Sequence, residues 1–464
     1  MSTVRQGRAA IAAGARLRDT GEKPRRARAE RAAVQARHPG SFFVSSRIHT
    51  GGEAVGGDGF VPGEAHYSYG LARSKFLDLL RSLNYQIQIL ARPELFFSEV
   101  SHRGLKFPLA GTPHLIFKPF EHIRLLKGAR NIACLAWEFD RLLTAETAKE
   151  PLLPMEDYVQ VAQKLDEIWT PSRFTRDTFA RHGFDRCHII PAPIADHPVD
   201  AVRRRRDVPP VLLTNFVFGG GWYQPRMLRS SSYMTLPEVL NEHYGGRRPK
   251  VLISVFNPAD WRKNPGPMLR AFLAFHQLHP DTLLIVKFVS DPSLGHLEHI
   301  LDHHIRIRMQ DVHHAFSFAI WVTDEFLPVD TYRQLLGFAD YYVCTSYCEG
   351  QNLPLQEAMN CGVVPVSVAH TAMADYLHEQ NAIVIPSKLT ALGIEESSAK
   401  RIHGARWFGV SDTDVFQALI RARSLAGREY DALSAAARLT VQDQFGYGTV
   451  ARLIENRLAG LRAP

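Results

Sequence analysis

The sequence contains no apolar run that approaches the roughly 18 consecutive residues a helix needs to cross a membrane. It is also poor in cysteine: the 464 residues include five, and none forms a Cys-x-x-Cys pair. Such sparse cysteines favour buried thiols in a reducing compartment over a disulfide framework. The amino-terminal segment lacks the apolar core of a secretory signal. We therefore expect a cytoplasmic protein without a transmembrane helix.

Positive charge is concentrated in the amino-terminal segment. The formal net charge of the chain is +8, but residues 1–40 contain ten Lys and Arg against three Asp and Glu. This segment alone therefore carries +7, and the rest of the chain is close to neutral. Basic tails attract anionic lipid or nucleic acid, although a solvated, disordered extension is the simpler interpretation. We expect a disordered tail and no nucleic-acid partner, with peripheral contact to the inner face of an anionic membrane as the functional alternative.

Apolar runs of strand length alternate with helical patterns along most of the remaining chain. In the first half the predicted strands are 41–48, 85–89, 114–120, 131–137, 167–172 and 187–193. In the second half they are 251–256, 282–288, 341–346, 363–368 and 382–386, with helical patterns at 268–276, 332–339, 355–361 and 372–379. Such alternation predicts α/β structure with parallel, doubly wound sheets.

The alternation is interrupted at residues 196–249, which contain four consecutive arginines, paired prolines and clusters of glycine and serine. The sequence therefore predicts two Rossmann-like domains that face each other across a cleft, where open α/β sheets bind their ligands. The predicted parts are a basic tail (1–40), an acceptor domain (41–195), a linker with an inserted strand near 211–218 (196–249), a donor-binding domain (250–428) and a helical region that packs back on the first domain (429–464).

The most informative stretch runs from Cys344 to Gly362. A predicted strand ends near residue 346, a polar loop follows, and Pro354 suits the first turn of a helix that Gly362 would end. The loop and the helix start would present free backbone N–H groups, which bind phosphate. Glu349 and Glu357 lie eight residues apart, and each carboxylate could accept hydrogen bonds from a vicinal diol. Taken singly, they would be read as a capping carboxylate and an exposed helix residue.

A basic pair follows the first strand of the second half. Arg262 and Lys263 come a few residues after the predicted strand 251–256, and two prolines open the next helix. Arginine offers a planar fork of donors and lysine a point charge, so the pair could neutralise a diphosphate. Agreement between this pair, the two glutamates and the two-domain pattern favours a binding site over the separate structural interpretations.

Residues 250–386 resemble the donor domain of retaining glycosyltransferases with the GT-B fold, specifically the large family four, also called group 1. The family's Glu-x7-Glu signature is matched by Glu349 and Glu357, and its Arg-Lys clamp by Arg262 and Lys263. The segment that begins at Thr170 and ends with Ile-Ile-Pro at 189–191 is similar to the family's interdomain approach segment. The resemblance covers roughly residues 60–460.

The resemblance implies transfer of a sugar from a nucleotide diphosphate sugar to an acceptor hydroxyl, with retention of anomeric configuration and without a required metal or other cofactor. Glu357 would bind the nucleotide ribose and Glu349 the donor sugar, while Arg262 and Lys263 stabilise the departing diphosphate. Backbone N–H groups would add donor contacts from a loop made of Gly350, Gln351, Asn352 and Leu353. Glycan or polysaccharide biosynthesis would be the setting, with a lipid-linked, glycan or protein acceptor.

The amino-terminal half departs from the family, because no histidine can be matched to the one that many members place near the reacting carbon. The corresponding strands end at residues 118–122 and 137–140, so the candidates for acceptor positioning are Glu121, His122 and Glu138. In the family the departing phosphate is thought to help deprotonate the acceptor, so a missing side-chain base does not exclude activity. The alternative is a non-catalytic GT-B relic that acts as a nucleotide- or partner-binding scaffold.

Two further patterns favour simpler interpretations than metal binding. Asp412-Thr-Asp414 has the form of a metal-binding Asp-x-Asp, but it precedes a helical pattern that Ser411 or Asp412 would cap. Histidines at 296–314 include His299 and His303, which are four apart, yet leucines form an opposite stripe, so a solvated helix face is expected. We therefore predict no metal site.

Overall fold

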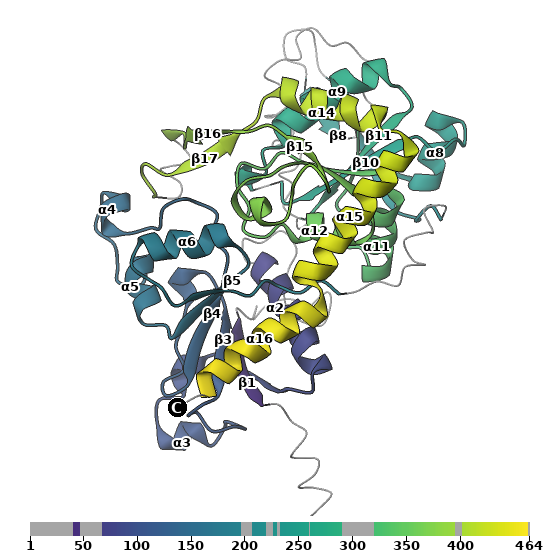
Figure 1. Cartoon of the computed structure of the whole chain (residues 1–464). Coiled ribbons are helices and arrows are strands. Elements are labelled where there is room, and N and C mark those ends of the chain that lie inside the picture. Colours follow the sequence, from purple (N-terminus) through teal and green to yellow (C-terminus); the bar gives the residue numbers. More distant parts are fainter. Residues whose placement is uncertain are drawn as a thin grey trace, which may run out of the picture.

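The structure is a computed structural model, described here for residues 40–46, 67–195, 207–219, 226–229, 233–258, 260–289, 320–394 and 401–462. The basic tail, the four consecutive arginines and the histidine-rich stretch lie outside these residues. The chain has an α/β fold in which two units, each built on its own sheet, are stacked end to end (Figure 1). We call residues 40–195 the first unit and residues 207–445 the second unit.

The sheet of the first unit has six parallel strands in the order β2-β1-β3-β4-β5-β6. These strands coincide with the six predicted ones to within a few residues: β1 (Ser41–Ser46), β2 (Gln86–Ile89), β3 (Pro113–Phe117), β4 (Arg130–Cys134), β5 (Glu167–Thr170) and β6 (Cys187–Ile189). The connecting segments form α2 (Tyr67–Ser82), η1 (Pro93–Leu95), α3 (Glu99–His102), η2 (Phe120–His122), α4 (Ala145–Ala148), α5 (Tyr158–Gln163) and α6 (Arg173–Arg181). Ser172 caps α6, because its hydroxyl accepts from the N–H of Thr175 at 3.2 Å.

The sheet of the second unit has the order β15-β14-β13-β10-β11-β12-β7-β8, with β9 paired to β7. The predicted strands appear as β10 (Lys250–Phe256), β11 (Thr282–Phe288), β13 (Tyr341–Cys344), β14 (Val364–Val368) and β15 (Ile383–Ile385). The strand expected near 211–218 is β7 (Leu212–Gly219), and it pairs antiparallel with β12 (Ile320–Thr323), β8 (Arg226–Arg229) and β9 (Met234–Thr235). Part of the predicted linker therefore extends this sheet.

The helices of the second unit cover its sheet and carry most of the motifs. They are α8 (Leu236–Tyr244), η3 (Trp261–Lys263), α9 (Pro265–Leu278), α11 (Val329–Phe338), α12 (Leu353–Asn360), α14 (Asp412–Ser424) and α15 (Gly427–Phe445). The capping interpretation of the Asp-x-Asp pattern is confirmed. Ser411 accepts from the N–H of Asp414 at 3.1 Å, and Asp412 forms an ion pair with Arg270.

The helix predicted at 372–379 is wrong: the chain forms the short 3₁₀ turn η6 (Thr371–Asp375). Thr371 has a positive φ of 50°, which an α-helix does not allow. Asn381 also ends the turn, because its side-chain amide donates to the carbonyl of Tyr376 and its Oδ1 accepts from the N–H of His378. Such side-chain bonds compete with the helical ladder.

Five short strands of the second unit were not predicted. They are β8, β9, β12 and the two strands of a hairpin, β16 (Lys388–Ala391) and β17 (Arg406–Gly409). The hairpin reaches the first unit: Arg406 pairs with Asp140 at 2.8 Å, and nearby Arg401 pairs with Glu156 at 2.8 Å and with Glu150. All four residues of β16 are exposed, so no apolar run marks this strand in the sequence.

The carboxyl-terminal helix returns to the first unit. After α15 the chain turns at Gly446 and continues as α16 (Tyr447–Arg462), which crosses over the first unit beside α2 (Figure 1). The crossing is held at the turn, where the N–H of Ile194 donates to the carbonyl of Phe445 at 2.8 Å. It is held again by Arg457, whose guanidinium makes two hydrogen bonds to the fully buried carboxylate of Glu167.

Replacing Glu167 with glutamine is expected to lower the free energy of unfolding by about 2–4 kcal/mol at pH 7, because a broken buried ion pair leaves cations unmatched. Burial raises the pKa of Glu167, but hydrogen bonds from Arg457, Trp169 and Arg130 outweigh it, so the net pKa lies below the ordinary value. The stabilisation is thus fully present above the unfolded-state pKa and is lost as pH falls through the folded one. Urea unfolding of wild type and Glu167→Gln between pH 7 and about pH 3, which crosses the ordinary glutamate pKa of about 4.3, checks this, and a difference that stays constant down to the acid end would contradict it.

All five cysteines are free and buried, as expected. No helix in the described ranges combines the length and hydropathy that a membrane span requires.

Candidate functional site

A cavity of about 410 Å³ lies between the two units, beside the carboxyl ends of their central strands. The first unit contributes mostly apolar side chains to its lining, including Phe76, Phe117, Leu135 and Ile190. The second unit contributes most of the polar and charged ones: Asn257, Asp260, Arg262, Lys263, Glu349 and Asn352. The cavity is therefore divided into an apolar side and a charged side.

Arg262 lies where the two units meet. It belongs to η3, the first helical turn after β10, and its guanidinium binds both oxygens of Asp260 at 3.0 and 2.6 Å. Its third nitrogen, Nη1, lies 2.6 Å from Oε1 of Glu138 in the first unit. Burial alone would raise the pKa of Asp260, but the charges of Arg262 and Lys263 outweigh it, so this pKa is lowered. The group that neutralises Arg262 thus stays ionised at neutral pH.

Lys263 and Glu349 form the second pair in the cavity. The ammonium of Lys263 lies 2.8 Å from both carboxylate oxygens of Glu349, which is 4% exposed. Burial lowers the pKa of Lys263, but the negative charges of Glu349 and Asp260 outweigh that effect and raise it. The lysine is therefore charged at neutral pH.

Hydrogen bonds with Ser346 and Thr371 of the second unit fix the position of Glu349. The hydroxyl of Ser346 donates to its Oε1 at 2.7 Å, and its own N–H donates to the hydroxyl of Thr371 at 3.0 Å. His370 lies 3.0 Å from the carbonyl of Ser346, and burial lowers its pKa to about 4. A neutral imidazole at this place supports the loop without adding charge.

The second predicted glutamate, Glu357, pairs across the cleft. It lies on α12, one turn after its start, and its Oε1 accepts from the ammonium of Lys75 on α2 at 2.6 Å. Both side chains are mostly buried. Glu357 is not among the residues that line the cavity, whereas Leu353 and Pro354 of the same helix are.

The loop of Gly350, Gln351, Asn352 and Leu353 lies against the first unit. A Cβ on Gly350 would lie 2.4 Å from the Cβ of Ala136, so only glycine allows this close approach. The side-chain amide of Gln351 accepts from the N–H of Ala192 and donates to its carbonyl. Gln351 therefore fastens the loop to the segment that follows β6.

Asn352 and Leu353 start α12. Asn352 takes a left-handed conformation with φ 64°, and its side chain caps the helix by accepting from the N–H of Leu355. Leu353 lines the cavity at the first position of the helix. A helix start beside Lys263 is a favourable place for an anion, because the free N–H groups and the helix dipole both attract negative charge.

The structure separates the three acceptor-side candidates of the first unit. Glu138 lines the cavity and contacts Arg262. Glu121 lies outside the lining, where it accepts from the hydroxyl of Tyr158 at 3.4 Å, and His122 is exposed on η2. Tyr69 also lines the cavity, and burial together with the nearby carboxylate of Glu138 raises its pKa, so it is a neutral hydroxyl.

Sequence reasoning missed Tyr69 and Lys75. Both lie on α2, more than 180 positions from the Arg-Lys pair. Nothing distinguishes them locally from other aromatic and basic residues of a helix. Asp260 is different, because an acidic residue two positions before an arginine is a signal that could have been used.

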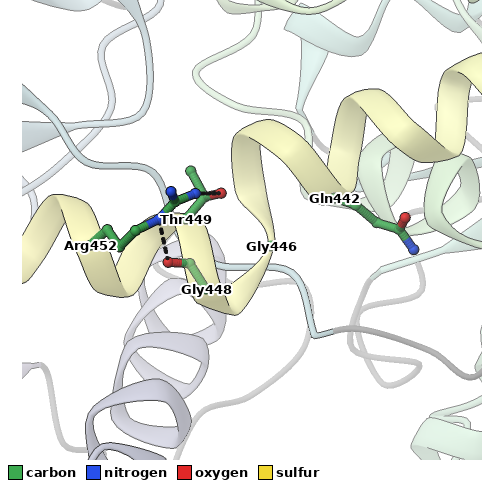
Figure 2. Close-up of a pocket in the computed structure, with 5 residues that line it drawn as sticks. All are labelled: Gln442, Gly446, Gly448, Thr449 and Arg452. Carbon is green, nitrogen blue, oxygen red and sulfur yellow. Dashed lines mark hydrogen bonds between the residues drawn. The ribbon is translucent and has the colours of Figure 1, made fainter.

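A second hollow, of about 590 Å³, lies at the turn between α15 and α16 (Figure 2). Its arginine, Arg452, donates to the carbonyl of Gly448 and the hydroxyl of Thr449 of its own helix. The hollow holds no cluster of charges comparable to that between the units. Nor does the described part of the chain contain a group of three or more His, Cys, Asp and Glu side chains that could hold a metal ion.

No protein-family model matches the sequence, and no curated protein matches it. Solved structures do match over most of the chain. A trehalose-6-phosphate synthase, OtsA, is 13% identical with a TM-score of 0.56, covering 90% of this chain and 99% of its own. A sucrose-phosphate synthase of Thermosynechococcus elongatus is 12% identical with a TM-score of 0.55, covering 91% and 98%. HepE of Anabaena, in complex with UDP and glucose, is 10% identical with a TM-score of 0.52, covering 90% and 99%.

These likenesses show the fold: the structural neighbours are GT-B glycosyltransferases, and the chain shares their arrangement of two Rossmann-like units around a central cleft.

Proposed function

We propose that this protein is a retaining glycosyltransferase that moves a sugar from a nucleotide diphosphate sugar to an acceptor hydroxyl. The observation that carries the proposal is the charged side of the cavity. Arg262, Lys263, Glu349 and the first residues of α12, Leu353 and Pro354, line it together, and Lys263 pairs with Glu349. The structural neighbours include complexes with UDP and UDP-glucose, which supports a nucleotide sugar as donor.

The chemistry that this arrangement favours is electrostatic. When the bond between the anomeric carbon and the phosphate oxygen breaks, negative charge develops on the diphosphate. Two fixed cations and a helix start stabilise that charge without reorganising. Because Arg262 and Lys263 are already neutralised by Asp260 and Glu349, the arriving diphosphate has to share them with these carboxylates. Glu349 is then free to accept hydrogen bonds from hydroxyls of the donor sugar.

Glu138 is the first-unit residue best placed to orient the acceptor. Its carboxylate contacts Arg262 and faces the cavity next to Tyr69. In the proposed reaction the acceptor oxygen bonds to the anomeric carbon on the face that the diphosphate leaves, and the acceptor proton passes to a leaving phosphate oxygen. Glu138 holds the acceptor hydroxyl during this exchange. The reaction needs no metal in this scheme, so activity is expected to be insensitive to chelators.

A thermal-shift panel of nucleotide sugars, without added metal, tests the proposal. A donor at 100 times its dissociation constant stabilises the folded protein by about 2.7 kcal/mol. That corresponds to several degrees, at roughly 2–4 °C per kcal/mol. We expect one donor class to raise the melting temperature and Glu357→Ala to abolish the shift. If no nucleotide sugar changes the melting temperature of the folded protein, the non-catalytic scaffold is favoured instead.

A further inference from the structure

The ion pair between Lys75 and Glu357 joins the two units at the edge of the cavity. Its atoms lie 2.6 Å apart, and the side chains are 15% and 18% exposed. Removing two charges from water is costly, and the attraction between them offsets that cost only when the geometry is good. A contact this short and this buried therefore fixes both side chains, which a surface pair does not.

Both residues lie next to the cavity on their own helices. Glu357 comes four positions after Leu353 on α12, so the two share one helix face, and Leu353 lines the cavity. Lys75 comes three positions after Ala72 on α2, and Ala72 lines the cavity from the opposite side. A group bound to the carboxylate of Glu357 would thus lie between α2 and α12, in reach of both units.

We propose that Lys75 is a positioning residue for the nucleotide ribose and that it couples ribose binding to closure of the cleft. This inference rests on the proposed function, in which Glu357 binds the ribose diol. Lys75 uses one carboxylate oxygen in a charge-assisted hydrogen bond, and the remaining acceptor sites of the carboxylate stay available to the two ribose hydroxyls. Without Lys75 the carboxylate can rotate away from that orientation.

The coupling follows from the origin of the two side chains. Lys75 belongs to the first unit and Glu357 to the second, so the oriented carboxylate exists only when the units are close together. A ligand shifts a conformational equilibrium only by its difference in affinity between the two states. The ribose 2′-hydroxyl is therefore expected to add affinity mainly in the closed state, and only while Lys75 is present.

Calorimetric titration with UDP, GDP and ADP and with their 2′-deoxy counterparts tests this inference. For the nucleotide that binds, the wild type is expected to prefer the ribose form by about tenfold, the low end for a hydrogen bond to a charged group. Lys75→Met is expected to reduce that preference to about twofold or less, and Lys75→Arg to retain most of it. Glu357→Gln should reduce the preference for the ribose form as much as Lys75→Met does. The double variant should reduce it no further than either single variant, because the effects of coupled residues are not additive.

Lys127→Met serves as the matched control, because Lys127 is an exposed lysine of the first unit outside the cavity lining. It should keep the wild-type preference. A Lys75→Met protein that binds the nucleotide and still prefers the ribose form tenfold would overturn the inference while leaving the proposed function intact. Tighter binding by Lys75→Met would also overturn it, since Lys75 would then compete with the ribose. If the wild type binds none of the nucleotides, the proposed function fails as well. Should Lys75→Met not fold, Lys75→Gln provides the same comparison.

Discussion

Lys263→Ala is expected to lower turnover by about a hundredfold or more, the loss seen when one preorganised donor to a developing negative charge is removed. Lys263 is the ammonium nearest the loop, 2.8 Å from both oxygens of Glu349, and its pKa is raised, so it is charged throughout the neutral range. Its removal also leaves Glu349 buried without a cation, which would repel the diphosphate of the donor. Steady-state kinetics with the donor identified by thermal shift measures the effect.

Lys164→Ala is the control for this experiment, because Lys164 is exposed at the end of α5 and is not part of the cavity lining. Its activity should equal that of the wild type. Lys263→Arg keeps a charge at the site and should retain part of the activity, although its planar fork does not reproduce the point charge of lysine. A folded Lys263→Ala enzyme with near-wild-type turnover would show that the diphosphate binds elsewhere.

Gly350→Ala is expected to lower activity by tenfold to a hundredfold, because the added methyl group would lie 2.4 Å from the Cβ of Ala136. Carbon atoms do not approach so closely, so the loop that contains Gly350 has to withdraw from the first unit. A displacement of about 1 Å between reacting groups can cost a hundredfold in rate. The contact partner is a side-chain methyl, which makes the effect reversible: the double variant Ala136→Gly, Gly350→Ala moves that methyl to the other side and should recover most of the activity.

Gly337→Ala is the matched control for the glycine. Gly337 lies within α11, and a Cβ there would meet no atom within 4 Å. Alanine is the better helix former, so this variant should be equally active and slightly more stable. If Gly350→Ala keeps full activity, the two units do not approach this closely during catalysis. If the double variant does not recover activity, the loss in Gly350→Ala comes from a change in the loop itself and not from the clash with the methyl group of Ala136.

The local sequence was sufficient to predict the elements that carry the site. Pro354 and Gly362 bound a helix by their backbone preferences alone, so the positions of Glu349 on a loop and Glu357 on a helix could be predicted. The same holds for Ser172 and Ser411, whose capping bonds involve residues three positions away. Twelve of the described strands also follow from runs of apolar residues in the sequence: β1 to β7, β10, β11, β13, β14 and β15.

Only the tertiary structure decided which distant side chains face these motifs. Lys75 meets Glu357 across 282 positions, and Glu138, not Glu121 or His122, meets Arg262. It also decided that Gln351 binds the backbone of Ala192 and that Gly350 lies against Ala136. The physical reason is the range of the interactions. Helix starts, caps and strands depend on interactions within a few residues. Contacts across the cleft depend on how the two sheets dock against each other, and the periodicity of a sequence does not specify that docking.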